Sequence, residues 1–192
     1  MMVVQMHGEP GSGKSTSARA IGRALPAVVV DKDSIASVLL GAGMAPLVAS
    51  GTAYDVMRSI GADLLAAGHH LVLDSPCYWP QIEEQGRALA ARFGARWLMV
   101  ECRCAADEVE RRLATRGAKA GQPTTRDSVT PRPGMYAVSC ERLVLDSSRP
   151  LEESVSEAVA YLRALTPDRS PVGGRGAARL GAVAASGREV VS

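Results

Sequence analysis

The sequence has few aromatic residues and almost no net charge. Only 4% of its 192 residues are Phe, Trp or Tyr, so Leu, Val and Ala must build the core. The net charge is +2, and the stretch 167–192 carries four Arg against two acidic residues, which leaves residues 1–166 neutral. Nucleic acid is therefore a disfavoured partner, since its binding normally requires a strongly basic face.

Zinc and membrane signals are also missing. Four Cys stand at 77, 102, 104 and 140 without a second Cys or His pair, and the three His have no metal-ligand spacing. We expect reduced cysteines in a cytoplasmic enzyme. No secretory signal is recognisable, and the apolar run at 2–6 is far too short to span a membrane.

One motif is highly specific. Residues 8–15 read Gly-Glu-Pro-Gly-Ser-Gly-Lys-Ser, which fits the phosphate-loop pattern G-x-x-x-x-G-K-[ST] at every fixed position. An apolar run precedes it and a helix-compatible run, 15–25, follows it, whereas a Gly-rich turn that binds nothing has no need of the Lys-Ser pair. The residues expected to bind nucleotide phosphates are Gly8, Gly11, Ser12, Gly13, Lys14, Ser15 and Thr16.

The phosphate loop also assigns chemistry to individual side chains. Lys14 should reach the β- and γ-phosphates, and the Ser15 hydroxyl should ligate Mg²⁺. A hydrophobic run ending in Asp74 is typical of a second Mg²⁺ carboxylate. Another buried run, 27–30, ends in Asp31 and Asp33, on the side of an open α/β sheet where ligands bind. Asp33 as a simple helix cap is the alternative.

The rest of the chain alternates between strand and helix patterns. We expect strands at 2–6, 27–30, 70–75, 96–102 and 142–147, helices at 15–25, 34–40, 52–67, 81–93, 105–116 and 151–165, and a Gly/Ala loop at 41–51. This alternation predicts an α/β fold: a doubly wound five-stranded parallel sheet with helices on both faces.

Two segments are candidates for the binding of substrate. Tyr78 and Trp79 follow the third strand and could line an acceptor pocket or pack under the next helix. The charged helix and polar loop at about 105–134 contain Arg112, Arg116 and Arg126, which suggest a lid that closes over the transferred phosphoryl group. A solvated face of Glu–Arg pairs is the alternative.

The order of these elements resembles the P-loop kinases of small acceptors over residues 1–165. That group includes gluconate and shikimate kinases, chloramphenicol phosphotransferase, adenylylsulfate kinase and the kinase part of polynucleotide kinase. The supporting motifs are Val30–Asp33, Glu110–Leu113 and Leu145–Glu153. The resemblance implies a P-loop NTPase fold with strand order 2-3-1-4-5, which would place Ser15 and Asp74 at one Mg²⁺.

The resemblance also implies roles for site residues. Asp33 matches the acid that accepts the acceptor's hydroxyl proton, and Asp31 its companion, which steers Mg²⁺ or the acceptor. Arg112 or Arg116 would contact adenine or phosphate, and Arg149 and Pro150 would lie along the adenine edge. Relatives that act on polynucleotides or sugars often carry an Arg shortly after the Asp pair. This chain has Ala36 and Ser37 there, which argues against a phosphate- or acid-bearing acceptor.

These observations lead to a functional hypothesis. We expect a kinase domain at 1–166, a disordered tail at 167–192, and transfer of the γ-phosphate of ATP, with Mg²⁺, to a hydroxyl of a small molecule. An antibiotic or other secondary metabolite, a sugar and a nucleoside are all open as acceptors. The alternatives are a kinase for a nucleic-acid 5′-hydroxyl or a nucleotide-sugar, and a nucleotide-hydrolysing switch. No Asn-Lys-x-Asp motif favours GTP.

Overall fold

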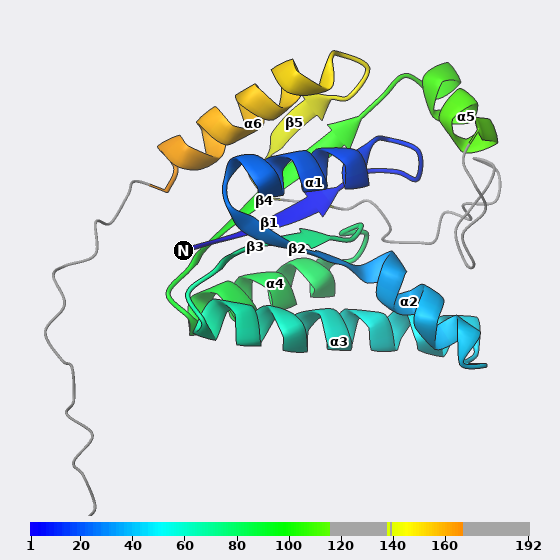
Figure 1. Ribbon diagram of the computed structural model, residues 1–192, viewed down its shortest axis with the longest axis vertical. Coiled ribbons are helices and arrows are strands. Elements are labelled where there is room, and N and C mark those ends of the chain that lie inside the picture. The colour runs from blue at the N-terminus through cyan, green and yellow to red at the C-terminus, as the bar shows by residue number, and fades with distance from the viewer. Residues whose placement is uncertain (116–137, 139, 167–192) are drawn as a thin grey trace, which may run out of the picture.

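A parallel sheet runs through the centre of the molecule (Figure 1). The computed structural model describes residues 1–115, 138 and 140–166. The strands are β1 (Met2–His7), β2 (Ala27–Asp31), β3 (His70–Asp74), β4 (Arg96–Arg103) and β5 (Leu143–Asp146). Every neighbouring pair is parallel, in the order β2-β3-β1-β4-β5, which confirms the predicted topology.

Helices cover both faces of this sheet. They are α1 (Lys14–Ala24), α2 (Lys32–Gly41), α3 (Pro46–Ala66), α4 (Pro80–Arg92), α5 (Ala106–Thr115) and α6 (Leu151–Ala164). Figure 1 shows α1 and α6 on one face, and α3 and α4 on the other. All six residues of β1 are buried, as expected for a strand covered on both sides. The prediction of a doubly wound sheet is confirmed.

Each face has its own apolar core. Met6, Ile21 and Leu162 belong to the core under α1 and α6, and Met57 and Leu89 to the core under α3 and α4. Burial of each such side chain contributes about 1.5–3 kcal/mol. The two cores fix the carboxyl ends of β1, β2, β3 and β4 at one edge, where the polar residues of the site lie.

The prediction of a loop at 41–51 is wrong. Helix α2 runs to Gly41 and α3 begins at Pro46, so only residues 42–45 connect them. Proline suits the first turn of a helix because its missing N–H would have no partner there. Gly51 lies on an open face of α3, where its low helix propensity costs only about 1 kcal/mol. Buried Ala49 and Ala53 offset that cost by packing.

The structure describes only part of the predicted lid and none of the predicted tail. Helix α5 and Arg112 are described, whereas Arg116, Arg126 and the remaining lid positions lie outside the described residues. The tail predicted at 167–192 also lies outside them. None of the helices in the described part of the chain is long and apolar enough to cross a membrane.

Candidate active site

The phosphate loop joins β1 to α1 in a conformation that requires glycine. Gly8 has φ of 135° and Gly13 of 82°, both in the region that L side chains rarely adopt. A Cβ on Gly8 would lie 2.5 Å from the carbonyl oxygen of Cys102, and one on Gly13 would lie 3.1 Å from Ser147 Cβ. The loop backbone therefore follows a path that only these residues permit.

The loop ends at the N-terminus of α1. Gly13 occupies the N-cap position, and no side chain in the described part of the chain caps this helix. The first N–H groups of a helix have no partner within it and carry partial positive charge. Together with Lys14, they form a site suited to phosphate oxygens.

Asp74 stands beside this loop as a buried acid. It is 3% exposed, and neither carboxylate oxygen has a hydrogen-bond partner among the described residues. Burial raises the pKa of Asp74; Lys14 and the Ser15 hydroxyl oppose this rise, although Ser15 does not reach hydrogen-bond geometry. Since a buried acid without a partner is costly, a bound cation would compensate Asp74.

These residues fit Mg²⁺. Its usual ligands are one or two protein oxygens completed by nucleotide phosphates and water. Ser15 and Asp74 supply one hydroxyl and one carboxylate next to Lys14. The described residues contain no group of three or more His, Cys, Asp or Glu that could hold a metal without such help.

Asp31 lies next to Asp74 in the sheet but is engaged locally. The two residues are register partners in the parallel pair of β2 and β3. Asp31 is the N-cap of α2: its Oδ1 accepts from the N–H groups of Asp33 (2.9 Å) and Ser34 (3.4 Å), and its Oδ2 accepts from the Ser34 hydroxyl (2.8 Å). The capping role that the sequence offered to Asp33 is therefore carried out by Asp31.

Asp33 is held by its neighbour in the chain. Lys32 Nζ lies 2.8 Å from Asp33 Oδ1 and 5.3 Å from the ring centre of Tyr54. The Tyr54 hydroxyl donates to the carbonyl oxygen of Pro76 at 2.8 Å. Asp33 is thus anchored through α3 to the segment that follows β3, on the same side of the sheet edge as Asp74, whose pKa its charge raises.

Tyr78 contacts residues at the start of the phosphate loop. The Tyr78 hydroxyl donates to the Gly8 carbonyl oxygen at 3.2 Å, and its ring packs edge-on to His7 with centroids 5.8 Å apart. Trp79 is the N-cap residue of α4 and is half-buried. Tyr78 therefore supports the start of the phosphate loop, a contact that the sequence did not predict.

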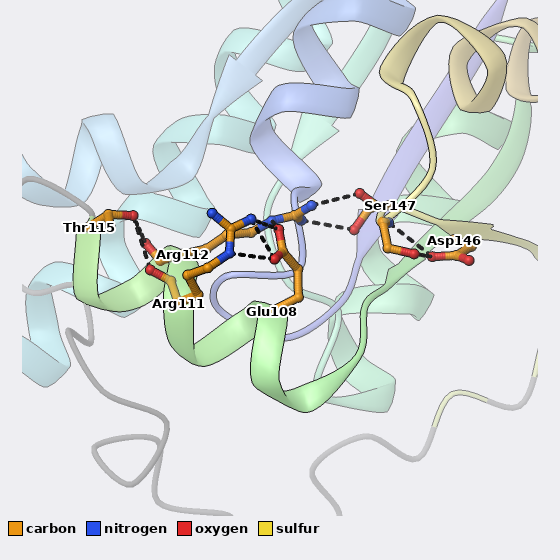
Figure 2. Close-up of polar contacts among 7 residues, drawn as sticks. Glu108, Arg111, Arg112, Thr115, Asp146 and Ser147 are labelled. Carbon is orange, nitrogen blue, oxygen red and sulfur yellow. Dashed lines mark hydrogen bonds and ion pairs between the residues drawn. The ribbon is translucent and has the colours of Figure 1, made fainter.

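Arg112 connects α5 to the segment after β5 (Figure 2). Its Nη2 donates to the Ser147 carbonyl oxygen at 2.8 Å, its Nη1 to the Ser147 hydroxyl at 3.1 Å, and its Nε to Glu108 at 2.6 Å. A Cβ on Gly13 would lie 3.2 Å from Nη1. Arg112 thus lies against the end of the phosphate loop, where a nucleotide would pass.

Arg149 and Pro150 lie farther along the same segment. Arg149, just before α6, pairs with Glu157 at 2.9 Å and with Glu153 at 3.2 Å, both on that helix, and all three side chains are exposed. Pro150 is the N-cap residue of that helix. Through these two ion pairs the Arg149 guanidinium is held against the first turns of α6.

A charge cluster that the sequence did not predict joins the last residues of β4 to Arg142, which directly precedes β5. Glu101 is 9% exposed and accepts from Arg103 Nε at 2.7 Å, from Arg103 Nη2 at 3.3 Å and from Arg142 Nε. With His7, these residues line a cavity of about 340 Å³ that also borders Gly8. The alternation Glu101-Cys102-Arg103 was the one available signal, because it places the acid and the base on one face of a strand.

A model of a known protein family matches this chain. The family model described as AAA domain (AAA_33) matches residues 3–130, two thirds of the chain. The chain belongs to the AAA_33 family. A search of curated proteins finds no match.

Solved structures with this fold include several kinases. They include the APS kinase CysC of Mycobacterium tuberculosis in complex with AMPPNP and APS, at 23% identity and a TM-score of 0.64 over 84% of this chain and 97% of that one. A gluconokinase from Sinorhizobium meliloti aligns at 19% identity and a TM-score of 0.59, over 85% and 93%. A sugar kinase from Janibacter sp. aligns at 16% and 0.60, over 84% and 94%. At these identities the likeness shows the fold that this AAA_33 chain shares with them.

Proposed function

We propose that this AAA_33 protein is an ATP- and Mg²⁺-dependent O-phosphotransferase that acts on a hydroxyl of a small molecule. The observation that carries the proposal is the buried Asp74 carboxylate, which has no hydrogen-bond partner among the described residues and lies beside Lys14 and Ser15 of a complete phosphate loop. The structural neighbours support it, since one of them was solved with the ATP analogue AMPPNP.

The proposed reaction assigns a role to each group. The acceptor hydroxyl oxygen forms a bond to the γ-phosphorus, the bond from that phosphorus to the β-phosphate oxygen breaks, ADP leaves, and Asp33 takes the hydroxyl proton. Mg²⁺ held by Ser15 and Asp74 would supply positive charge beside the phosphates of the nucleotide. Lys14 and the first N–H groups of α1 stabilise the negative charge of those phosphates, because they are fixed in place before reaction.

The nucleotide would be held at both ends. Ser15 and Asp74 are the proposed Mg²⁺ ligands, and Asp31 lies in register with Asp74 beside them. Arg112, which is hydrogen-bonded to Ser147, would contact the nucleotide beside Gly13. Arg116 and Arg126 complete the proposed lid from outside the described residues. Asp33, which is paired with Lys32, would orient the acceptor hydroxyl and accept its proton.

The experiment follows label from [γ-³²P]ATP with Mg²⁺ into a panel of small hydroxyl compounds and a 5′-hydroxyl oligonucleotide. We expect a labelled small molecule. Label on the oligonucleotide would instead identify a nucleic-acid kinase, and free phosphate alone would identify a hydrolase.

Asp33→Asn tests the assigned base. Its kcat should fall about 10²–10⁴-fold while the KM for ATP stays unchanged, because Asp33 acts on the acceptor. Asp63→Asn, an exposed acid on α3, is the matched control and should behave as wild type. Full activity in Asp33→Asn would remove Asp33 from the mechanism.

A further inference from the structure

The cavity beside the phosphate loop has the size and position of a binding site. Its volume of about 340 Å³ lies within the range of small-molecule sites, about 300–1,000 Å³. It opens at the carboxyl ends of β1 and β4, and Gly8 and Glu9 of the phosphate loop form one of its walls. Its contents would therefore lie next to the bound phosphates.

The opposite wall carries a net positive charge. Burial would raise the pKa of Glu101, but hydrogen bonds from Arg103 and Arg142 outweigh burial and lower it. Glu101 is therefore ionised at neutral pH. Two guanidinium groups against Glu101 leave this wall with a charge of about +1, and Glu9 on the facing wall adds one carboxylate to the lining of the cavity.

Arg142 has several acceptors, and the cluster retains unused donors. Arg142 Nη1 also donates to the carbonyl oxygens of Cys140 at 3.1 Å and Val138 at 3.5 Å, so its guanidinium is held on several sides. Among the described residues, Nη1 of Arg103 and Nη2 of Arg142 have no hydrogen-bond partner. Fixed guanidinium N–H groups of this kind are suited to carboxylate and phosphate oxygens.

His7 adds a neutral donor. Burial lowers its pKa, with Glu101 opposing, so the imidazole is uncharged at pH 7. Its Nδ1 accepts from the Cys77 N–H at 3.3 Å, which places the ring proton on Nε2. The wall thus offers donors from three residues.

The strand order separates this wall from the proposed base. Asp33 follows β2, whereas Arg103 is the last residue of β4 and Arg142 directly precedes β5. From β4 to β2 there are three strand spacings, roughly 14 Å. A molecule that contacts both places must carry its anionic group and its reactive hydroxyl at opposite ends.

We propose that the cavity binds the acid group of an elongated hydroxy acid, and that Arg103 and Arg142 select for that group. The acid is a carboxylate or a phosphate monoester, since the same donors suit both. The proposal rests on the proposed kinase activity and names the substrate class of its acceptor.

The test compares acceptors that differ only in the acid. Aldonic acids of several chain lengths, alditol phosphates and the alditols that match both are offered with [γ-³²P]ATP. We expect an aldonic acid or an alditol phosphate to be labelled at least 10-fold more efficiently than its alditol, and which of the two it is identifies the acid. An alditol labelled equally well would overturn the proposal and leave the kinase activity standing. Label found only as free phosphate would overturn both.

Variants of the cluster separate recognition from folding. Arg142→Gln and Arg103→Gln should each raise the KM for the acid about 10–100-fold while the KM for ATP stays constant. Arg96→Gln, at the other end of β4, is the matched control. If Arg142→Gln does not fold, Arg103→Gln still tests the proposal, because the Arg103 side chain is 60% exposed.

Glu101→Gln should not raise the KM for the acid, in contrast to the two arginine variants. Removal of its negative charge increases the positive charge of the wall, so the KM for the acid should fall or stay constant. A KM that rises for the acid and the alditol alike in all three variants would show a purely structural cluster and overturn the proposal.

Discussion

Replacement of Asp74 by Asn should stabilise the protein in the absence of Mg²⁺ while removing its response to the metal. Asp74 is 3% exposed and has no hydrogen-bond partner among the described residues. A buried charge of this kind costs several kcal/mol, and Lys14 offsets part of that cost. An unpaired amide costs about 1–3 kcal/mol. The balance favours Asn by about 1–2 kcal/mol.

The pH dependence gives the sign of the effect. The folded protein holds the Asp74 proton more tightly than the unfolded chain does, because burial raises the pKa above its ordinary value of 3.8. Between the two pKa values, wild type therefore loses stability as the pH rises. The two proteins should have equal stability below the unfolded pKa, where both side chains are neutral, and should differ fully above the folded pKa.

Thermal melting with EDTA from pH 4 to 8 measures this difference. An advantage of about 1–2 kcal/mol corresponds to a rise in Tm of about 2–8 °C for a domain of this size. Addition of Mg²⁺ with a non-hydrolysable ATP analogue should stabilise wild type by about 2.7 kcal/mol at a hundred times its Kd, and Asp74→Asn by less. A lower Tm for Asp74→Asn at pH 8 in EDTA would refute the reasoning, as would an equal gain from Mg²⁺.

Three further substitutions test the surroundings of the site. Gly8→Ala should cost about 3 kcal/mol or more in chemical denaturation, since its Cβ would lie 2.5 Å from the Cys102 carbonyl oxygen; a stability equal to wild type would contradict the described loop path. Arg112→Ala should lower stability by about 1–2 kcal/mol and raise the KM for ATP, because its bonds to Ser147 are lost; an unchanged KM would remove it from the nucleotide site. Asp31→Ala should cost about 1 kcal/mol as a lost helix cap and Asp31→Asn much less; equal losses would argue against capping.

Much of the fold was available from the sequence because its signals are local. The phosphate loop fixes a strand, a turn and a helix within a few residues, and buried runs that end in Asp31 and Asp74 locate two more strands. The strand order came from the resemblance to P-loop kinases, and it brings those two acids into register. The helix at 46–51 was missed because Gly51 and the small residues around it are typical of a loop, and only packing against α2 outweighs that preference.

The complete charge cluster could not have been predicted, because Arg142 joins Glu101 and Arg103 only through sheet pairing. Glu101 and Arg142 lie far apart in the chain and become neighbours when β4 pairs with β5. The absence of Arg at positions 36 and 37 argued against an acid-bearing acceptor, whereas the structure brings Arg103 and Arg142 to the phosphate loop from the other side. The capping role of Asp31 was equally hidden, since Asp31 and Asp33 both suit a helix start.

The most direct test of the central claim is transfer of label from [γ-³²P]ATP to a hydroxyl compound by wild type and by Lys14→Ala. We expect a labelled acceptor that depends on Mg²⁺ with wild type, and none with Lys14→Ala, which loses the ammonium group at the β- and γ-phosphates. Equal transfer by both proteins, or label released only as inorganic phosphate by wild type, would contradict the account.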